Sequence, residues 1–309
     1  MADLTLLGPQ RRRPTIADAV DRLGVDGPVA AVTAGWRERE GEDEEIAEHL
    51  GRPVTDLLLH RRAEQVFADD RALFEAHRER QNRLREMQQL YRYRLDFAIE
   101  PARELLRRKD DSELLEAERE AAIAAIRRLD EDHLRRIAKV HREFERRRRP
   151  HRRRAVREQR LEIAGVLERS AALVIAGGHV AVLINRLRLF GIADLAAEMP
   201  VIAWSAGAMA LGERIVLFHD SPPWGAGNAE MLENGLGLYR GLLALPDAGR
   251  RLRLEDPERV ALFARRFAPD LCLAFDDGAE TTRRDGAWRP NEEIRRLTVA
   301  GEVRPLEAA

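Results

Sequence analysis

The sequence predicts an α/β protein whose mainly parallel sheet carries helices on both faces and is interrupted by a long helical hairpin. In both end regions, short apolar runs of strand length alternate with amphipathic segments, a pattern typical of such a sheet. The stretch 61–169 between them has almost no glycine and a helical apolar period. Charged residues reach 35% of the chain, which exceeds the usual share of about 25% and indicates long solvated helices.

The stretch 15–60 is predicted to begin the α/β domain. Residues 28–33 form an apolar run of strand length that ends at Gly35. Residues 42–50 then place Ile46 and Leu50 on one helical face, and 54–59 form a second candidate strand.

The stretch 61–150 is predicted to be an antiparallel helical hairpin with coiled-coil-like packing. We expect Pro101 and the segment 109–112 to break the helical run, with Ser112 capping the second arm. Pro150 separates the hairpin from a shorter helix over 152–169. The residues that share the apolar faces are Leu73, Leu84, Met87, Tyr91 and Leu95 in the first arm and Ile126, Leu129, His133, Ile137, Val140 and Phe144 in the second.

The stretch 151–300 is predicted to complete the α/β domain. Strands are expected at 171–176, 200–203, 214–218 and 271–275, and a helix at 180–189. Active sites of parallel sheets lie at the carboxyl ends of the strands, so the residues at these ends are the first candidates for function. They are Gly35-Trp36, Gly177-Gly178, Ser205, His219-Asp220 and Asp276-Asp277.

The run 201–207 has the pattern of a nucleophile elbow, a sharp turn from a strand to a helix that exposes a serine hydroxyl. Ser205 follows an apolar run, and Ala203 stands at the first glycine position of the Gly-x-Ser-x-Gly pattern. The backbone N–H of Ala206 would face a developing oxyanion, and Gly177-Gly178 could supply a second donor. An ordinary tight turn between small residues is the plain alternative.

Three motifs carry a family resemblance. Ala176-Gly-Gly-His179, Trp204-Ser-Ala-Gly-Ala208 and His219-Asp-Ser-Pro222 resemble the dipeptidase E and cyanophycinase family of serine peptidases. The resemblance covers the first strand and most of 170–285, and leaves the helical stretch as an insertion. It implies a flavodoxin-like fold of the class I glutamine amidotransferase type, with a serine where the amidotransferases have a cysteine.

The resemblance also implies roles for individual residues. Ser205 matches the nucleophile and Asp220 the acid of the triad, while Gly178 matches the oxyanion loop and His179 stands where the family often has asparagine. The triad histidine is expected in the segment 245–248, where Asp247 occupies its place. The implied triad is therefore incomplete.

Three hypotheses for function follow. A serine hydroxyl needs an adjacent base to act as a nucleophile, and an ordinary carboxylate is a weak one at neutral pH. The first hypothesis is thus a serine-peptidase-like protein with weak or no activity that binds a peptide or a small amide. In the second, His219 or His179 acts as the base of an active hydrolase. In the third, the hairpin mediates self-association or partner docking.

Other features remain open at the level of sequence. Residues 142–160 hold ten arginines and three glutamates, which suits a phosphate or an acidic partner as well as a solvated helix end. No nucleic-acid-binding motif accompanies them. The segment 36–40 is either a wall of the cleft or a charged surface loop, and Asp276-Asp277 could orient a substrate amine.

No cofactor motif or spaced set of metal ligands is recognised. A net charge of −1, a single cysteine and the lack of an apolar span or signal-peptide core predict a cytoplasmic protein that does not enter membranes.

Overall fold

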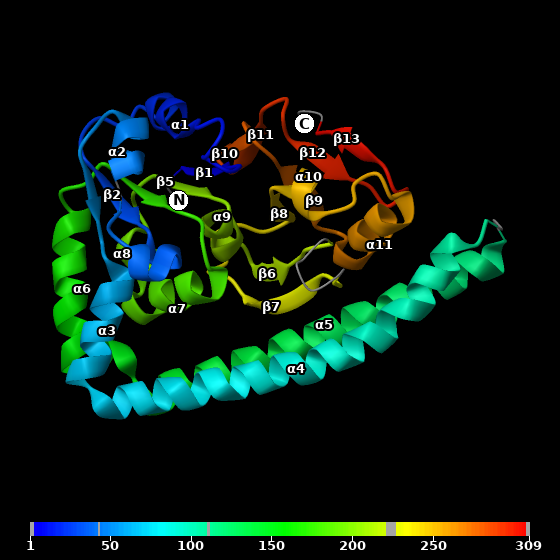
Figure 1. Cartoon of the computed structure of the whole chain (residues 1–309), viewed down its shortest axis with the longest axis horizontal. Coiled ribbons are helices and arrows are strands. Elements are labelled where there is room, and N and C mark those ends of the chain that lie inside the picture. Colours follow the sequence, from blue (N-terminus) through cyan, green and yellow to red (C-terminus); the bar gives the residue numbers. More distant parts are fainter. Residues whose placement is uncertain (1–2, 43, 110–111, 221–226, 307–309) are drawn as a thin grey trace.

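The computed structural model describes residues 3–42, 44–109, 112–220 and 227–306. It is a mixed α/β structure with a central, mostly parallel sheet and a long helical hairpin that runs along one side of the body (Figure 1). The central sheet has seven strands, of which five are parallel and two at one edge are antiparallel. Their order is β11 (Ala287–Pro290), β10 (Glu280–Arg284), β1 (Leu4–Leu7), β5 (Val201–Trp204), β4 (Ala172–Ile175), β2 (Val29–Val32) and β3 (Val54–Asp56).

The remaining described strands form two smaller sheets. Two of the predicted strands do not join the central sheet, because the strands at 214–217 and 271–275 pair outside it. β8 (Leu242–Pro246) and β9 (Leu271–Phe275) are parallel, and β12 (Arg295–Leu297) and β13 (Val303–Pro305) extend that sheet. β6 (Arg214–Leu217) pairs only with β7 (Glu230–Asn234) among the strands described.

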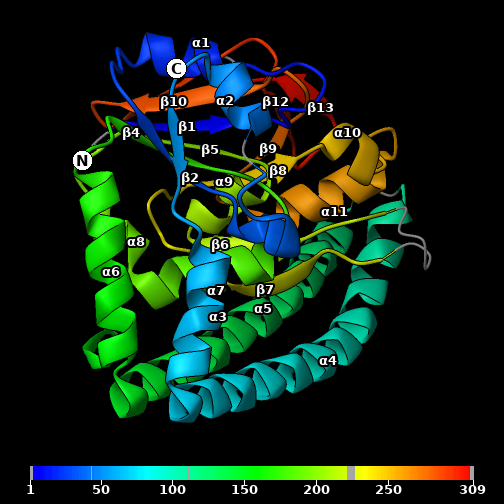
Figure 2. The same cartoon turned by 60° about the vertical axis from the view of Figure 1, so that its left-hand side comes forward.

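Helices cover both faces of the central sheet (Figure 2). Side chains on a strand alternate between the faces, and in β2 Val29 and Ala31 belong to one buried cluster while Ala30 and Val32 belong to the other. α1 (Ile16–Arg22) and α2 (Glu44–Leu50) cover the first face, with Ile46 and Leu50 buried as predicted. The other helices of the body are η1 (Ala34–Arg39), α3 (Leu59–Asp69), α6 (Arg154–Leu167), α7 (Val180–Phe190), α8 (Ile192–Leu195), α9 (Ala206–Leu211), α10 (Ala248–Arg251) and α11 (Pro257–Phe267).

The hairpin consists of α4 (Arg71–Arg107) and α5 (Glu113–Arg148), and its seam agrees with the predicted period. All six seam residues predicted for the second arm are buried, whereas Leu84 and Met87 of the first arm are half-buried. Ser112 caps α5, since its hydroxyl accepts a hydrogen bond of 3.3 Å from the N–H of Leu115. The hairpin packs against β7 and α11 rather than projecting alone. The short helix η2 (Pro150–Arg152) then leads into α6.

Three boundary predictions are wrong. Pro101 lies within α4 and does not break it, because packing against α5 and α11 along the same stretch holds the helix despite the lost hydrogen bond. The second strand ends at Asp56, and Leu59 already begins α3. The first arm begins at Arg71, since Asp70 caps it by accepting a hydrogen bond of 3.0 Å from Leu73 N–H. Asp110 and Asp111 of the predicted break lie outside the described residues.

Two further features bear on the sequence predictions. β1 precedes the strand that was expected to be first and lies between β5 and β10, with all four of its residues buried. Over the part of the chain that the structure describes, no helix has both the length and the apolar character needed to cross a membrane.

Candidate functional site

Ser205 lies at a sharp turn between β5 and α9. Its backbone has φ 52° and ψ −122°, a conformation that L-residues adopt only at a cost in free energy and that is enriched at functional sites. This is the strand–turn–helix geometry in which an elbow serine presents its hydroxyl at the start of a helix. The side chain is half-buried, and its Oγ makes no hydrogen bond to another described residue.

Two glycines allow the backbone to pack closely around this turn. A Cβ on Gly177 would lie 2.7 Å from the Cβ of Ser205 and 3.5 Å from its Oγ. A Cβ on Gly207 would overlap the carbonyl oxygen of Ile175 in β4. The elbow helix therefore rests directly on the neighbouring strand, and only residues without a side chain fit at these two positions.

The loops that follow β2, β4 and β5 meet at this edge of the sheet. The N–H of His179 donates a hydrogen bond of 2.8 Å to the carbonyl of Gly35, and Gly178 has φ 110°. The backbone nitrogen of Ala206 lies 3.4 Å from the position of a Cβ on Gly177. Neither Ala206 N–H nor Gly178 N–H bonds to another described residue. The amide of Ala206 is thus available to an oxyanion beside Ser205, and the amide of Gly178, in the adjoining loop, is unbonded as well.

The two candidate histidine bases differ in their surroundings. His179 caps α7, where its Nδ1 accepts a hydrogen bond of 3.3 Å from Val182 N–H. The same Val182 N–H donates at 3.1 Å to the carbonyl of His179, so the contact with Nδ1 is the longer of the two bonds that this amide makes. His219 is exposed, and its carbonyl accepts a hydrogen bond of 3.3 Å from Gly227 N–H. Ser221 and Pro222 of the same motif lie outside the described residues.

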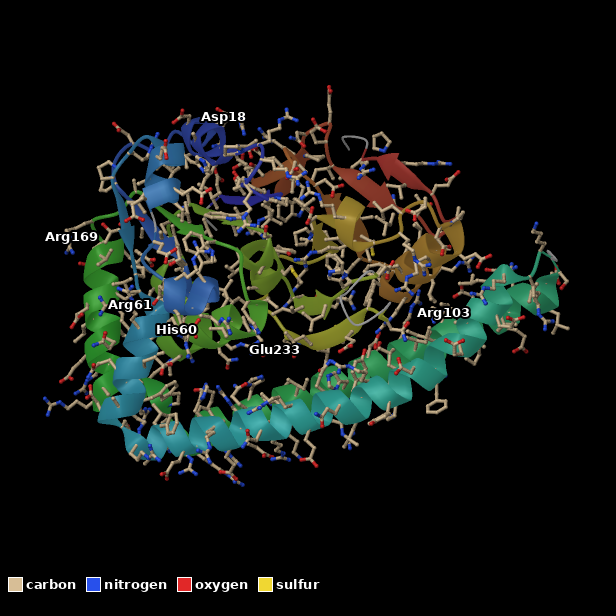
Figure 3. The ribbon with its side chains drawn as sticks, in the orientation of Figure 1. Asp18, His60, Arg61, Arg103, Arg169 and Glu233 are labelled. Atoms are coloured by element: carbon tan, nitrogen blue, oxygen red, sulfur yellow. The ribbon has the colours of Figure 1, made fainter. Side chains whose placement is uncertain are left out.

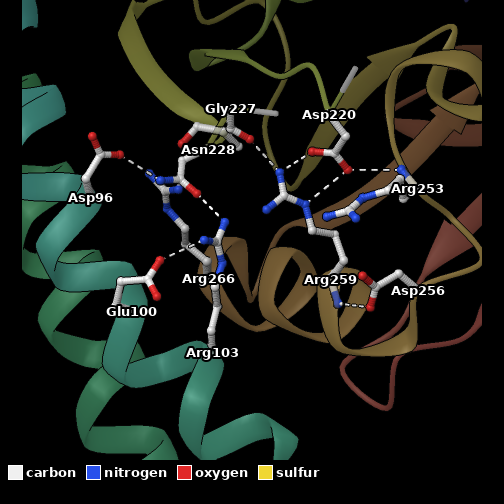
Figure 4. A network of polar contacts seen from close by, with 11 residues as sticks. Asp96, Glu100, Arg103, Asp220, Gly227, Asn228, Arg253, Asp256, Arg259 and Arg266 are labelled. Atoms are coloured by element: carbon white, nitrogen blue, oxygen red, sulfur yellow. Dashed lines mark hydrogen bonds and ion pairs between the residues drawn. The ribbon is translucent and has the colours of Figure 1, made fainter. Parts of the chain in front are cut away.

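Asp220 is buried and bound by an arginine (Figure 4). Arg259 donates from Nε at 3.0 Å to one carboxylate oxygen and from Nη2 to the other, and Arg253 N–H donates at 3.0 Å. Arg259 also reaches the carbonyl of Gly227 at 2.6 Å. Both oxygens of Asp220 are therefore engaged by cationic or amide donors of the α11 region, and neither is bonded to a described histidine.

Asp247 lies at the carboxyl end of β8, in the smaller parallel sheet. It has φ 59° and ψ 37°, and its Oδ1 is 3.4 Å from Nη1 of Arg250. Arg250 also reaches Asp277 at 3.3 Å, while the adjacent Asp276 accepts a hydrogen bond of 2.8 Å from Gly249 N–H. The acidic residues after β8 and β9 thus form a cluster of their own around the start of α10.

The segment after β2 contains residues whose positions the sequence did not reveal. Glu40 is fully buried and accepts hydrogen bonds of 2.7 Å from the N–H groups of both His60 and Arg61 (Figure 3 labels these two). Burial raises the pKa of Glu40 and lowers that of His60. Arg37 has φ 59° and ψ −114°, a strained conformation close to that of Ser205. For Glu40 the surface-loop alternative is wrong.

The structure brings only some of the predicted site residues together. Gly35, Gly177, Gly178, Ser205 and Ala206 lie at one edge of the central sheet. Cys272 offers no second nucleophile, because burial raises the pKa of its thiol to about 12. The arginine that holds Asp220 is 39 residues away in the sequence, so no local pattern signals that contact.

Comparison with known proteins adds little to this geometry. No family model matches the chain, and no curated protein matches it. A crystal structure of a peptidase from an acI-B1 Actinobacterium is similar at 12% sequence identity and a TM-score of 0.48, covering 99% of this chain and 97% of that one. A likeness of this strength supports no inference about function.

Proposed function

We propose that this chain is a serine-peptidase-like protein of the amidotransferase-type fold whose triad is incomplete. Ser205 and the two free amides would bind the carbonyl of a peptide or a small amide, with weak or no hydrolysis. The observation that supports this most is the strained backbone of Ser205 at the junction of β5 and α9, with Gly177 packed against it. Strain of this kind persists where a site requires it.

The contacts made by the described acidic candidates and by His179 support weak activity. Asp247, which stands where the triad histidine is expected, pairs with Arg250, and a carboxylate is an ordinarily weak base at neutral pH. The carboxylate of Asp220 forms an ion pair with Arg259. Nδ1 of His179 accepts a hydrogen bond from Val182 N–H at the start of α7. Loss of one triad member costs about 10⁴-fold in turnover in serine hydrolases. In the alternative of an active hydrolase, His219 or His179 is the base.

Labelling with a fluorophosphonate tests this proposal. We expect the wild-type protein to label no faster than the Ser205→Ala variant, because the hydroxyl lacks a base. The Asp247→His variant should label faster than wild type, and Ser205→Ala in that background should remove the gain. Labelled residues are identified by mass spectrometry of the digested protein.

Rapid labelling of wild-type Ser205 would contradict the proposal. If His219→Ala then abolished that labelling, the active-hydrolase alternative would take its place. Circular dichroism spectra of all variants serve as the folding control.

A second candidate function, self-association, is favoured by the outer face of α4. We propose that two copies pair there through Leu90, Tyr93 and Phe97, which are 58%, 70% and 82% exposed and recur at helical spacing. In an antiparallel pair centred between residues 93 and 94, Leu90 would meet Phe97, and Arg83 would meet Glu104 of the other copy. The face is therefore complementary to itself where Leu90 meets Phe97.

Sedimentation velocity tests this second candidate. We expect a dimer of the wild-type chain and a monomer of the Tyr93→Ala/Phe97→Ala variant, since large apolar side chains dominate such interfaces. Leu161→Ala is the matched control, because Leu161 on α6 is 68% exposed and lies outside this face. A monomeric wild-type protein, or a dimer that survives the double substitution, would show that α4 does not mediate pairing.

A further inference from the structure

A large cavity lies away from Ser205, between the end of α5, η2 and α7. Its volume is about 1030 Å³. Arginine dominates its polar lining, and Ala138, Leu187 and Leu236 form apolar parts of the wall. The basic residues that line it are His141, Arg142, Arg146, Arg149, His151, Arg152 and Arg188. We call it the basic cavity.

Four of these arginines have no acidic partner. Arg142, Arg146, Arg149 and Arg152 make no ion pair with any residue that the structure describes. Elsewhere arginines pair widely, and the chain has 53 basic and 54 acidic residues. The four guanidinium groups are therefore a local excess of positive charge rather than part of a basic surface extending over the whole protein.

Two acidic residues, Glu145 and Asp194, also line the basic cavity. Neither makes an ion pair with another residue that the structure describes, so four unpaired arginines face two carboxylates and the wall keeps a positive excess. Arg188, in contrast, is already paired with the buried Glu233. Its charge is therefore balanced within the wall, and we do not count it in the excess.

The backbone holds the four arginines around one turn. Arg149 ends α5 with φ 45° and ψ 57°, and its N–H donates a hydrogen bond of 3.0 Å to the carbonyl of Glu145. The chain reverses at Pro150, and Arg152 N–H donates at 2.9 Å to the carbonyl of Arg149. Side chains from α5 and η2 thus converge on the same space.

We propose that the basic cavity binds a small molecule that carries two or more phosphate groups. Guanidinium groups bind phosphate oxygens through paired N–H donors, and four such groups exceed what one phosphate needs. A nucleic-acid backbone fits less well, because the site is concave, the net charge of the chain is −1, and no Phe, Tyr or Trp side chain lines the wall for base stacking. This inference is independent of the role of Ser205.

Isothermal titration of the full chain with sodium tripolyphosphate at physiological salt tests the proposal. We expect binding by the wild-type protein and at least a roughly tenfold weaker Kd for Arg142→Gln/Arg146→Gln, which removes two ligands of the anion. The matched control is Arg147→Gln/Arg148→Gln, which makes the same charge change on the same helix outside the wall. Its Kd should stay within about threefold of wild type, since the two removed charges act on the ligand only through screened, longer-range electrostatic attraction.

Three results would overturn the proposal. One is no heat of binding from the wild-type protein. Another is an equal loss in both double variants, which would indicate a diffuse basic surface. The third is tighter binding of a single-stranded DNA oligonucleotide than of tripolyphosphate, which would identify a nucleic-acid surface instead. Thermal melts of both variants confirm that each is folded.

Discussion

Replacing Arg266 by alanine is expected to destabilise the protein by about 3–5 kcal/mol, because it leaves a buried charge without its partner. Arg266 on α11 donates to both oxygens of Asp130 at 2.7 and 2.8 Å, to the Tyr91 hydroxyl at 2.9 Å and to the carbonyl of Ala229 at 2.7 Å. The side chains of Arg266 and Asp130 are only 2% and 6% exposed. Urea unfolding followed by circular dichroism measures the loss.

This network joins the hairpin to the body. Tyr91 of α4 donates to Asp130 of α5 at 2.7 Å and accepts from Met231 N–H of β7 at 3.1 Å. The ring of His133 stacks on that of Tyr91 at 4.0 Å, and burial lowers the pKa of His133 to about 4. Four elements therefore depend on one guanidinium group, and we expect Arg266→Ala to expose the hairpin to proteolysis as well.

The neighbouring Arg265 supplies the control. It pairs with Glu116 and Glu120, whose side chains are 47% and 53% exposed, and exposed pairs contribute at most about 1 kcal/mol. Arg265→Ala should therefore change the free energy of unfolding far less than Arg266→Ala. Similar losses for the two variants would show that the buried pair does not anchor the hairpin.

The second large effect is expected for Gly207→Ala, which should destabilise the protein by about 2–3 kcal/mol. The new methyl group would overlap the backbone carbonyl of Ile175, and it would lie 3.0 Å from the carbonyl oxygen of Ala176. Neither carbonyl is at the end of a flexible side chain, so α9 must move away from β4. The same urea titration measures the change.

Gly165→Ala is the matched control, because it makes the same substitution with the opposite expected sign. Gly165 lies within α6, and an added Cβ would meet only a terminal nitrogen of Arg169, at 3.5 Å. Alanine in place of a helical glycine stabilises by roughly 0.5–1 kcal/mol. If both variants were equally stable, the close contact between the elbow and β4 would not limit residue size at position 207.

The sequence was most informative where local periodicity decides the structure. The seam from Ile126 to Phe144 recurs at steps of three and four, and these residues are buried in α5. The prediction that Pro101 breaks the helix was wrong. Proline is locally unfavourable within a helix, but α4 also packs on α5 and α11, and this packing outweighs the local effect. β1 is only four residues long, too short for its period to identify it as a central strand.

For the candidate site, the sequence located the turn but not the charges around it. The small residues on both sides of Ser205 indicated a tight strand-to-helix turn, and the backbone of Ser205 has that form. The engagement of Asp220 by Arg259 and of Asp247 by Arg250 came only from the folded chain. Whether these contacts leave Ser205 without a base remains the prediction that fluorophosphonate labelling tests.

The sequence by itself determined the helical hairpin, the α/β character of both end regions, the turn at Ser205 and the cluster of arginines near Pro150. Only the tertiary structure decided that β8 and β9 leave the central sheet, that Arg266 meets Asp130, and that Arg142 and Arg152 face one cavity. Periodicity and turn chemistry act over a few neighbouring residues, so they can be seen in the sequence. Strand partners and ion pairs join residues that are far apart along the chain, and the packing of the whole molecule selects them.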